Sequence, residues 1–145
     1  MVTCAQMEKI FKEIQPHFVL VGDADSYAGL FTSDAVWWPL NRSTRIGPAE
    51  IRAGVTEVLQ GTTTVAVFEA LEMHEADPVS FAVLSGTETI SFHNGAPTQV
   101  VHSREIWMFR EENGLPKICR MIWNQDPGVS TGGAPAKRAP TRGRR

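Results

Sequence analysis

Residues 22–55 constrain the fold of this chain most, because they place a helix, a strand and a second helix in close succession. The first helix is predicted to begin at Asp23 or Asp25, whose carboxylate can accept hydrogen bonds from the free N–H groups of a helix start. Apolar side chains then recur at helical spacing, namely Ala24, Tyr27, Leu30 and Phe31. This spacing predicts a short helix with one apolar face.

The strand and the second helix of this unit have equally local signals. Residues 35–38, Ala-Val-Trp-Trp, favour a β-strand, and Pro39 stops it. Gly47 closes the next loop, and Pro48 fits the first turn of a helix. The buried face of that helix is predicted to carry Ile51, Val55, Val58 and Leu59.

The segments on either side complete the pattern. A helix is predicted over about residues 4–21, and Pro16, which lacks an N–H, should kink or split it near Ile14. Four later segments are predicted to be strands: 63–75, 80–92, 98–110 and 115–124. Residues 65–76 also favour a helix by composition, but the threonine run that opens this segment favours a strand.

Turn signals connect these four strands. Asn94-Gly95 is the strongest short hairpin signal, and Asn113-Gly114 and Asp77-Pro78 mark two further turns. Consecutive hairpins build an antiparallel sheet, and helices that precede such a sheet must cover one of its faces. The expected fold class is therefore α+β.

This order of elements resembles a known superfamily. The residues that carry the resemblance are Gly22-Asp23, the run 30–37, and Gly47 followed by Glu50-Ile51. They resemble the nuclear-transport-factor-two-like superfamily, in particular the branch of polyketide cyclases (SnoaL-like) and ketosteroid isomerases. The resemblance implies a cone-shaped α+β barrel, in which three N-terminal helices pack on a curved, mainly antiparallel sheet around a pocket. This fold hosts several chemistries and some members with none.

Charge divides the chain into two parts. All 16 acidic residues lie at or before Asp126 with nine Lys and Arg, which gives residues 1–127 a net charge of −7, and five basic residues follow. We expect one SnoaL-like domain over 1–127 and a disordered, basic, Gly/Pro-rich tail over 128–145. An acidic domain argues against nucleic-acid binding. The tail could contact a phosphate polymer or an acidic partner, or simply add solubility.

The sequence also narrows location and cofactors. No run reaches membrane-spanning length and no signal pattern is present, so we expect a cytoplasmic protein with no membrane association. Cys4 and Cys119 are expected to be free thiols. The sequence holds no dinucleotide, P-loop or hydrolase motif and no metal-ligand spacing, so cofactor-free acid–base chemistry is the expectation.

Glu105 is the first candidate for that chemistry. Strand alternation places Glu105 on one face with Ser103 and Trp107, and the resemblance places it where the family has an acidic oxyanion-hole residue. A carboxyl among Trp107, Met121 and Trp123 would be desolvated, which raises its pKa toward that of a working acid or base. The alternative is a structural ion pair with Arg104, Arg110 or Arg120.

Further candidates follow from the same alternation. Histidine is the commonest proton-transfer side chain, but His102 lies on the face opposite Glu105, where it could also be a surface or dimer-face residue. The Tyr27 hydroxyl could reach a ligand or a backbone carbonyl. The predicted substrate-binding residues are Trp38, Trp107, Met121, Trp123, Ser103 and Thr87. The positions of the family's general-base aspartate and oxyanion tyrosine fall at Trp38 and near Gln15, so an isomerase of that specific kind is not expected.

Two functions remain open from the sequence. The first is a cofactor-independent enzyme of isomerase, cyclase, dehydratase or epoxide-hydrolase type, which acts on a small hydrophobic, polyketide- or terpenoid-like metabolite. The second is a non-catalytic binding module or dimerising scaffold of the same fold. A homodimer is expected through the outer sheet face, which carries His102, Arg104, Ile106, Arg120 and Ile122.

Overall fold

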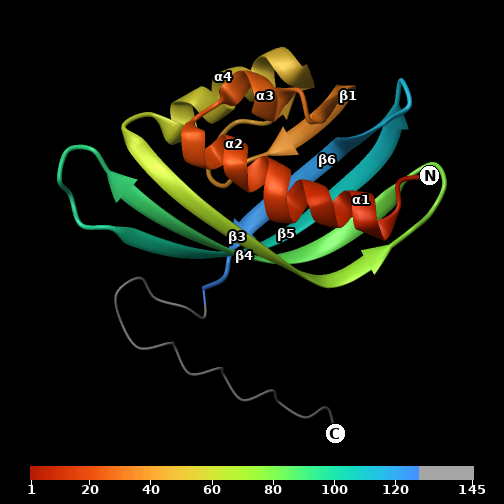
Figure 1. Ribbon diagram of the computed structural model, residues 1–145. Helices are drawn as coiled ribbons and strands as arrows, with labels where there is room; N and C mark the ends of the chain where they lie inside the picture. Colours follow the sequence, from red (N-terminus) through yellow and green to blue (C-terminus); the bar gives the residue numbers. More distant parts are fainter. Residues whose placement is uncertain (128–145) are drawn as a thin grey trace, which may run out of the picture.

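The computed structural model describes residues 1–127 as a curved six-stranded sheet whose concave side is covered by helices (Figure 1). The strand order is β2-β1-β6-β5-β4-β3. The expected basic tail, 128–145, lies outside the described residues. No helix among residues 1–127 is long and apolar enough to cross a bilayer.

The first helical unit consists of α1 (Cys4–Lys9), η1 (Ile10–Ile14) and α2 (Gln15–Val21). Thr3 caps its start by accepting from the backbone N–H of Gln6. The π-turn η1 ends just before Pro16, which has no N–H to continue the α-helical hydrogen bonds. The predicted split near Ile14 is therefore confirmed, and it turns Gln15 toward the interior, where only 4% of the residue is exposed.

Residues 22–59 have the predicted order of helix, strand and helix. Asp23 caps α3 (Ala24–Ala28) by accepting from the Ser26 N–H, β1 (Phe31–Trp38) follows, and α4 (Gly47–Leu59) closes the unit. Helix α3 ends earlier than the apolar spacing through Phe31 suggested, because Phe31 already belongs to β1 and pairs with β6. The two-residue strand β2 (Arg45–Ile46) was not predicted, since so short a strand has no periodicity.

The four long strands form the cone in consecutive hairpins: β3 (Thr62–His74), β4 (Ser80–Phe92), β5 (Gln99–Glu112) and β6 (Leu115–Gln125). The helix-prone segment 65–76 lies mostly in β3, because pairing along β4 outweighs its local propensity. Asn113 and Gly114 both have positive φ, as an Asn-Gly hairpin requires. Within residues 1–127 every strand pair except β1 with β6 is antiparallel. Helices followed by a mainly antiparallel sheet confirm the α+β prediction.

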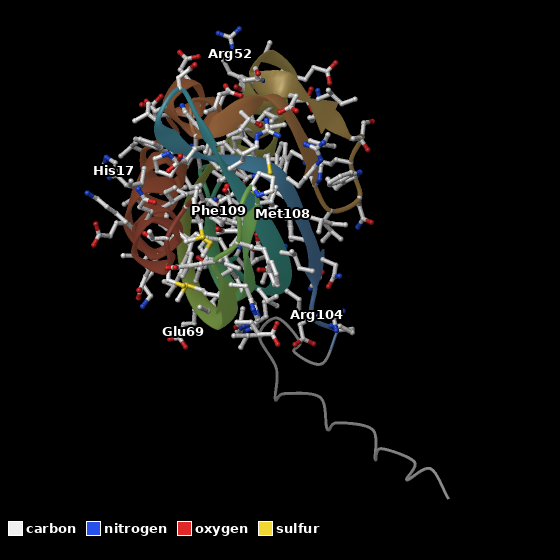
Figure 2. All side chains as sticks on the ribbon, turned by 90° about the vertical axis from the view of Figure 1, so that its right-hand side faces the viewer. His17, Arg52, Glu69, Arg104, Met108 and Phe109 are labelled. Carbon is white, nitrogen blue, oxygen red and sulfur yellow. The ribbon has the colours of Figure 1, made fainter. Side chains whose placement is uncertain are left out.

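The core lies between the helices and the concave face of the sheet. Its fully buried side chains include Met7, Phe11, Ile51, Trp107 and Phe109. Charged side chains such as Arg52, Glu69 and Arg104 lie at the surface (Figure 2). Helices cover only the concave face in Figure 1, so no helix within residues 1–127 covers the outer face of β5 and β6.

A β-bulge corrects the predicted alternation of β6. Met108 pairs with Arg120 and Phe109 pairs with Ile118, so Cys119 is an extra residue on its strand. The bulge places both Ile118 and Cys119 in buried positions. Strict alternation would place Ile118 on the face opposite Cys119 and Met121, and the bulge removes this difference, whereas Met121 and Trp123 line the cavity on the inner face.

Candidate functional site

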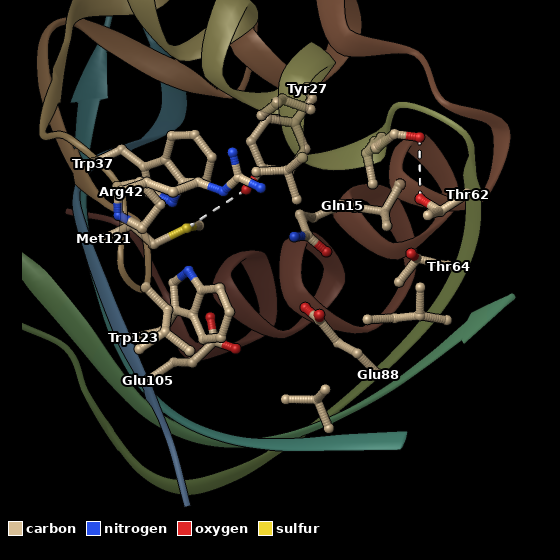
Figure 3. A pocket seen from close by; sticks show the side chains of 18 of the residues that line it. Gln15, Tyr27, Trp37, Arg42, Thr62, Thr64, Glu88, Glu105, Met121 and Trp123 are labelled. Atoms are coloured by element: carbon tan, nitrogen blue, oxygen red, sulfur yellow. Dashed lines mark hydrogen bonds between the residues drawn. The ribbon is translucent and has the colours of Figure 1, made fainter. Parts of the chain in front are cut away.

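A cavity of about 280 Å³ lies between the helices and the concave sheet. Most of its wall is apolar and aromatic, and the main contributors are Val19, Trp37, Val55, Phe68, Phe92, Met121 and Trp123. Gln125 is one polar residue of its lining. The other polar side chains that line it are labelled in Figure 3: Gln15, Tyr27, Arg42, Thr62, Thr64, Glu88 and Glu105. An aromatic wall with few polar groups suits a small, flat, largely apolar ligand.

Glu105 is held firmly in the wall of this cavity. Ser103 Oγ donates to Glu105 Oε2 at 2.6 Å, and Trp107 Nε1 donates to Oε1 at 2.9 Å. Alternation along β5 brings the three side chains to one face, so a single strand supplies the carboxyl and both of its donors. Gly86 pairs with Ser103 on the adjacent strand, and its missing side chain leaves room for the Ser103 hydroxyl.

Burial raises the pKa of Glu105 from 4.5 to about 7. The hydrogen bonds from Ser103 and Trp107 lower this pKa in part, and the nearby charge of Glu88 raises it. A carboxyl with this pKa is present in both acid and base forms near neutrality, which is what proton transfer requires.

The three arginines proposed as ion-pair partners of Glu105 all bind elsewhere. Arg104 donates to Asn124, and Arg110 forms an ion pair with Asp34 at 2.6 Å. Arg120 donates to backbone carbonyls. None of these arginines binds Glu105 within residues 1–127, so the structural alternative for this carboxyl does not hold.

Glu88 is a second carboxyl of the cavity, and the sequence analysis missed it. It extends from β4, and burial raises its pKa. Its backbone pairs with Val101, while Glu105 pairs with Leu84, an even number of positions away on the same strand. The hairpin register predicted from Asn94-Gly95 could therefore have placed both carboxyls on one face.

Tyr27 and Gln15 lie across the cavity from the sheet. The Tyr27 hydroxyl donates to Met121 Sδ at 3.6 Å, and burial raises the pKa of this phenol, so it stays neutral. Gln15 lies near the position where the resemblance places the family's oxyanion tyrosine, and its amide also lines the cavity. Its Oε1 and the indole Nε1 of Trp37 are buried without a hydrogen-bond partner.

The structure brings Glu105, Tyr27, Met121 and Trp123 together in the cavity wall, as predicted. Ser103 and Trp107 stand behind Glu105, where they position its carboxyl without lining the cavity.

Trp38, Thr87 and His102 lie outside the cavity. Trp37 lines the wall in place of Trp38, which is 38% exposed, because adjacent strand residues point to opposite faces. Thr87 Oγ1 and His102 Nδ1 meet at 3.3 Å on the outer sheet face. Trp38 and Thr87 were expected to line the pocket and lie outside it, and His102 lies on the face opposite Glu105.

Arg42 is the only cationic side chain that lines the cavity within residues 1–127, and it is exposed at the cavity's edge. It follows β1 in the loop that leads to β2. Nowhere in the described part of the chain do three or more His, Cys, Asp or Glu side chains gather as they would to hold a metal ion.

No family model and no curated protein sequence matches the chain. Solved structures match it over most of its length. A ketosteroid isomerase-like protein from Erwinia carotovora atroseptica has a TM-score of 0.70 at 14% identity and covers 81% of this chain and 95% of its own. A hexachlorocyclohexane dehydrochlorinase (LinA) type 2 has a TM-score of 0.76 at 13% identity and covers 94% and 93%.

Aln2 from a Streptomyces species is a third neighbour, with a TM-score of 0.73 at 17% identity and coverage of 83% and 89%. These identities are low, so the likeness concerns the fold, and the neighbours that have this fold include enzymes. The chain therefore has the same cone-shaped α+β fold as these neighbours, which is the fold that the sequence resemblance implied.

Proposed function

We propose that this chain is a cofactor-independent acid–base enzyme that acts on a small, flat, hydrophobic metabolite. Glu105 is its proton-transfer residue. The reaction belongs to the isomerase, cyclase, dehydratase or epoxide-hydrolase type, and the substrate is a polyketide- or terpenoid-like ring compound.

One observation carries the proposal: a buried carboxyl, held by Ser103 and Trp107, faces an aromatic cavity with a pKa of about 7. The two donors fix the direction of the carboxyl, and burial makes its acid and base forms nearly equal in free energy near neutrality. Such a group can remove a proton from a carbon or oxygen atom of the substrate and deliver it to another atom of the substrate. The carboxyl then ends the reaction in the protonation state in which it began. The names of two structural neighbours, an isomerase-like protein and a dehydrochlorinase, are consistent with chemistry of this kind.

The test uses a probe that reports a base in an apolar cavity without knowledge of the natural substrate. In 5-nitrobenzisoxazole, a base removes the ring C–H proton, the N–O bond breaks, and a coloured phenolate forms. The wild-type rate should rise with pH as Glu105 ionises and level off above about pH 7. Glu105→Gln should lower the rate by ~100-fold or more, because an amide is not a base.

The matched control is Glu69→Gln, which changes an exposed glutamate on strand β3. It should leave the rate unchanged. If Glu105→Gln keeps the wild-type rate, Glu105 is not the base. If the wild type shows no rate above that of free acetate at the same concentration, the chain is better described as a binding module of the same fold.

A further inference from the structure

We infer that Gln15 and Glu88 form a subsite that receives a hydroxyl group of the ligand, so that the natural substrate is a hydroxylated ring compound. The inference rests on the proposed function, because it takes the cavity around Glu105 as the ligand site. It goes further in naming the polar group that the ligand must carry and the residues that select it.

The first step is the position of the two side chains. Gln15 extends from the helical layer and Glu88 from β4, and they point toward one another across the cavity (Figure 3). Both residues line the same space as Glu105. The carboxyl of Glu105 lies toward Trp123, away from the Gln15–Glu88 pair (Figure 3). A ligand in this cavity therefore meets two separate polar regions.

The second step is that neither side chain of the pair accepts a hydrogen bond from a donor within residues 1–127. Gln15 Oε1 is buried without a donor. Within residues 1–127 no side chain or backbone N–H donates to the Glu88 carboxylate, in contrast to Glu105, which accepts from two residues. A buried acceptor without a donor, such as Gln15 Oε1, is unfavourable, so this subsite favours a ligand that supplies a donor.

The third step is the chemistry of the missing group. Gln15 Oε1 and an ionised Glu88 are both acceptors, so the group between them must be a donor. The amide of Gln15 also interacts with the Tyr27 hydroxyl. When the NH2 group of this amide makes that contact, Oε1 is left as the acceptor for a ligand. A hydroxyl group on a flat ring satisfies the acceptors, while the ring contacts Phe68 and Trp123 in the wall.

The experiment compares two non-reacting probes, 2-naphthol and 2-methoxynaphthalene, which share the ring system and differ in the hydroxyl donor. Affinities are measured by calorimetric titration near neutral pH. Wild-type protein should bind the naphthol roughly 10- to 100-fold more tightly, the range expected for a hydrogen bond to a charged acceptor. Glu88→Leu should abolish this preference, and Gln15→Leu should reduce it. The exposed-site control Glu69→Gln should retain it in full.

Glu88→Gln provides a second variant that keeps the shape of the side chain if the leucine variant does not fold. Its neutral amide is a weaker acceptor, so the preference for naphthol should fall. Equal affinity of the two probes for wild-type protein, or a preference that persists in a folded Glu88 variant, would overturn the inference. Failure of both probes to bind would overturn it as well.

The pH dependence gives an independent readout. The other titratable groups that line the cavity in the described part of the chain are Tyr27, Arg42 and Glu105, so the measurement is made in the Glu105→Gln background. Protonated Glu88 can donate directly to Gln15 Oε1 and close the subsite, so the preference should fall as the pH falls through the raised pKa of Glu88. A preference that does not change with pH would mean that Glu88 is not the acceptor.

These outcomes are separate from those of the proposed function. Probe affinity does not require proton transfer by Glu105, and the benzisoxazole reaction does not require a hydroxyl on its substrate. Loss of turnover in Glu105→Gln with equal probe affinities would retain the acid–base proposal and remove the hydroxyl subsite.

Discussion

Replacing Glu105 by glutamine should change the pH dependence of stability in a defined direction. The folded-state pKa of about 7 lies above the ordinary value of 4.5, so folding favours the protonated form of this carboxyl. At about 1.4 kcal/mol per pKa unit, this difference corresponds to about 3 kcal/mol. Below 4.5 the carboxyl is neutral in both states and the burial penalty is absent. As the pH rises to about 7, the unfolded state ionises first and wild-type stability falls.

Glu105→Gln removes this titration, and it keeps the shape of the side chain and one acceptor for Trp107 or Ser103. The variant should therefore gain stability relative to wild type as the pH rises, by up to about 3 kcal/mol at pH 8 compared with pH 4. Urea unfolding of both proteins across this range measures the difference. Carboxylates with lowered pKa values, such as Asp23 and Asp34, titrate in both proteins and cancel in the comparison.

Two results would refute this reasoning. A stability difference that does not change with pH would mean that the pKa of Glu105 is not raised by burial. A wild-type advantage that grows with pH would mean that the ionised carboxylate has a cationic partner in the folded protein. Either result would also weaken the case for Glu105 as an acid–base residue, because both arguments use the same desolvation.

Three further predictions concern other parts of the molecule. Gly86→Ala would place a Cβ against the Ser103 hydroxyl and 2.8 Å from the Phe68 ring, so urea unfolding should show a loss of about 1–3 kcal/mol, whereas the outer-face control Ser85→Ala should not. We propose a homodimer through the outer sheet face, where Ile106 and Ile122 are 44% and 47% exposed; Ile106→Lys should shift sedimentation toward monomer, and a wild-type monomer at high micromolar concentration would contradict the proposal. Truncation after Pro127 should leave the melting temperature unchanged, because residues 128–145 offer almost no apolar side chains to a core, and a drop of several degrees would contradict this.

The sequence determined the order of the helices and long strands and, on β5, which residues share a face. Caps, prolines and hairpin residues act within a few positions, so the signals at Asp23, Pro16 and Asn113-Gly114 did not depend on the rest of the chain. Alternation along β5 is equally local, and it separated Glu105 from His102 correctly.

Only the tertiary structure decided which of these residues share the cavity. Adjacent residues such as Trp37 and Trp38 have the same local preferences, and the inward one is identified only when β1 is paired and covered by helices. The bulge at Cys119 shifts the alternation of β6, and no local signal marks it. Glu88 faces Gln15 because the sheet curves beneath the helices, and contacts between segments distant in sequence depend on that curvature rather than on periodicity.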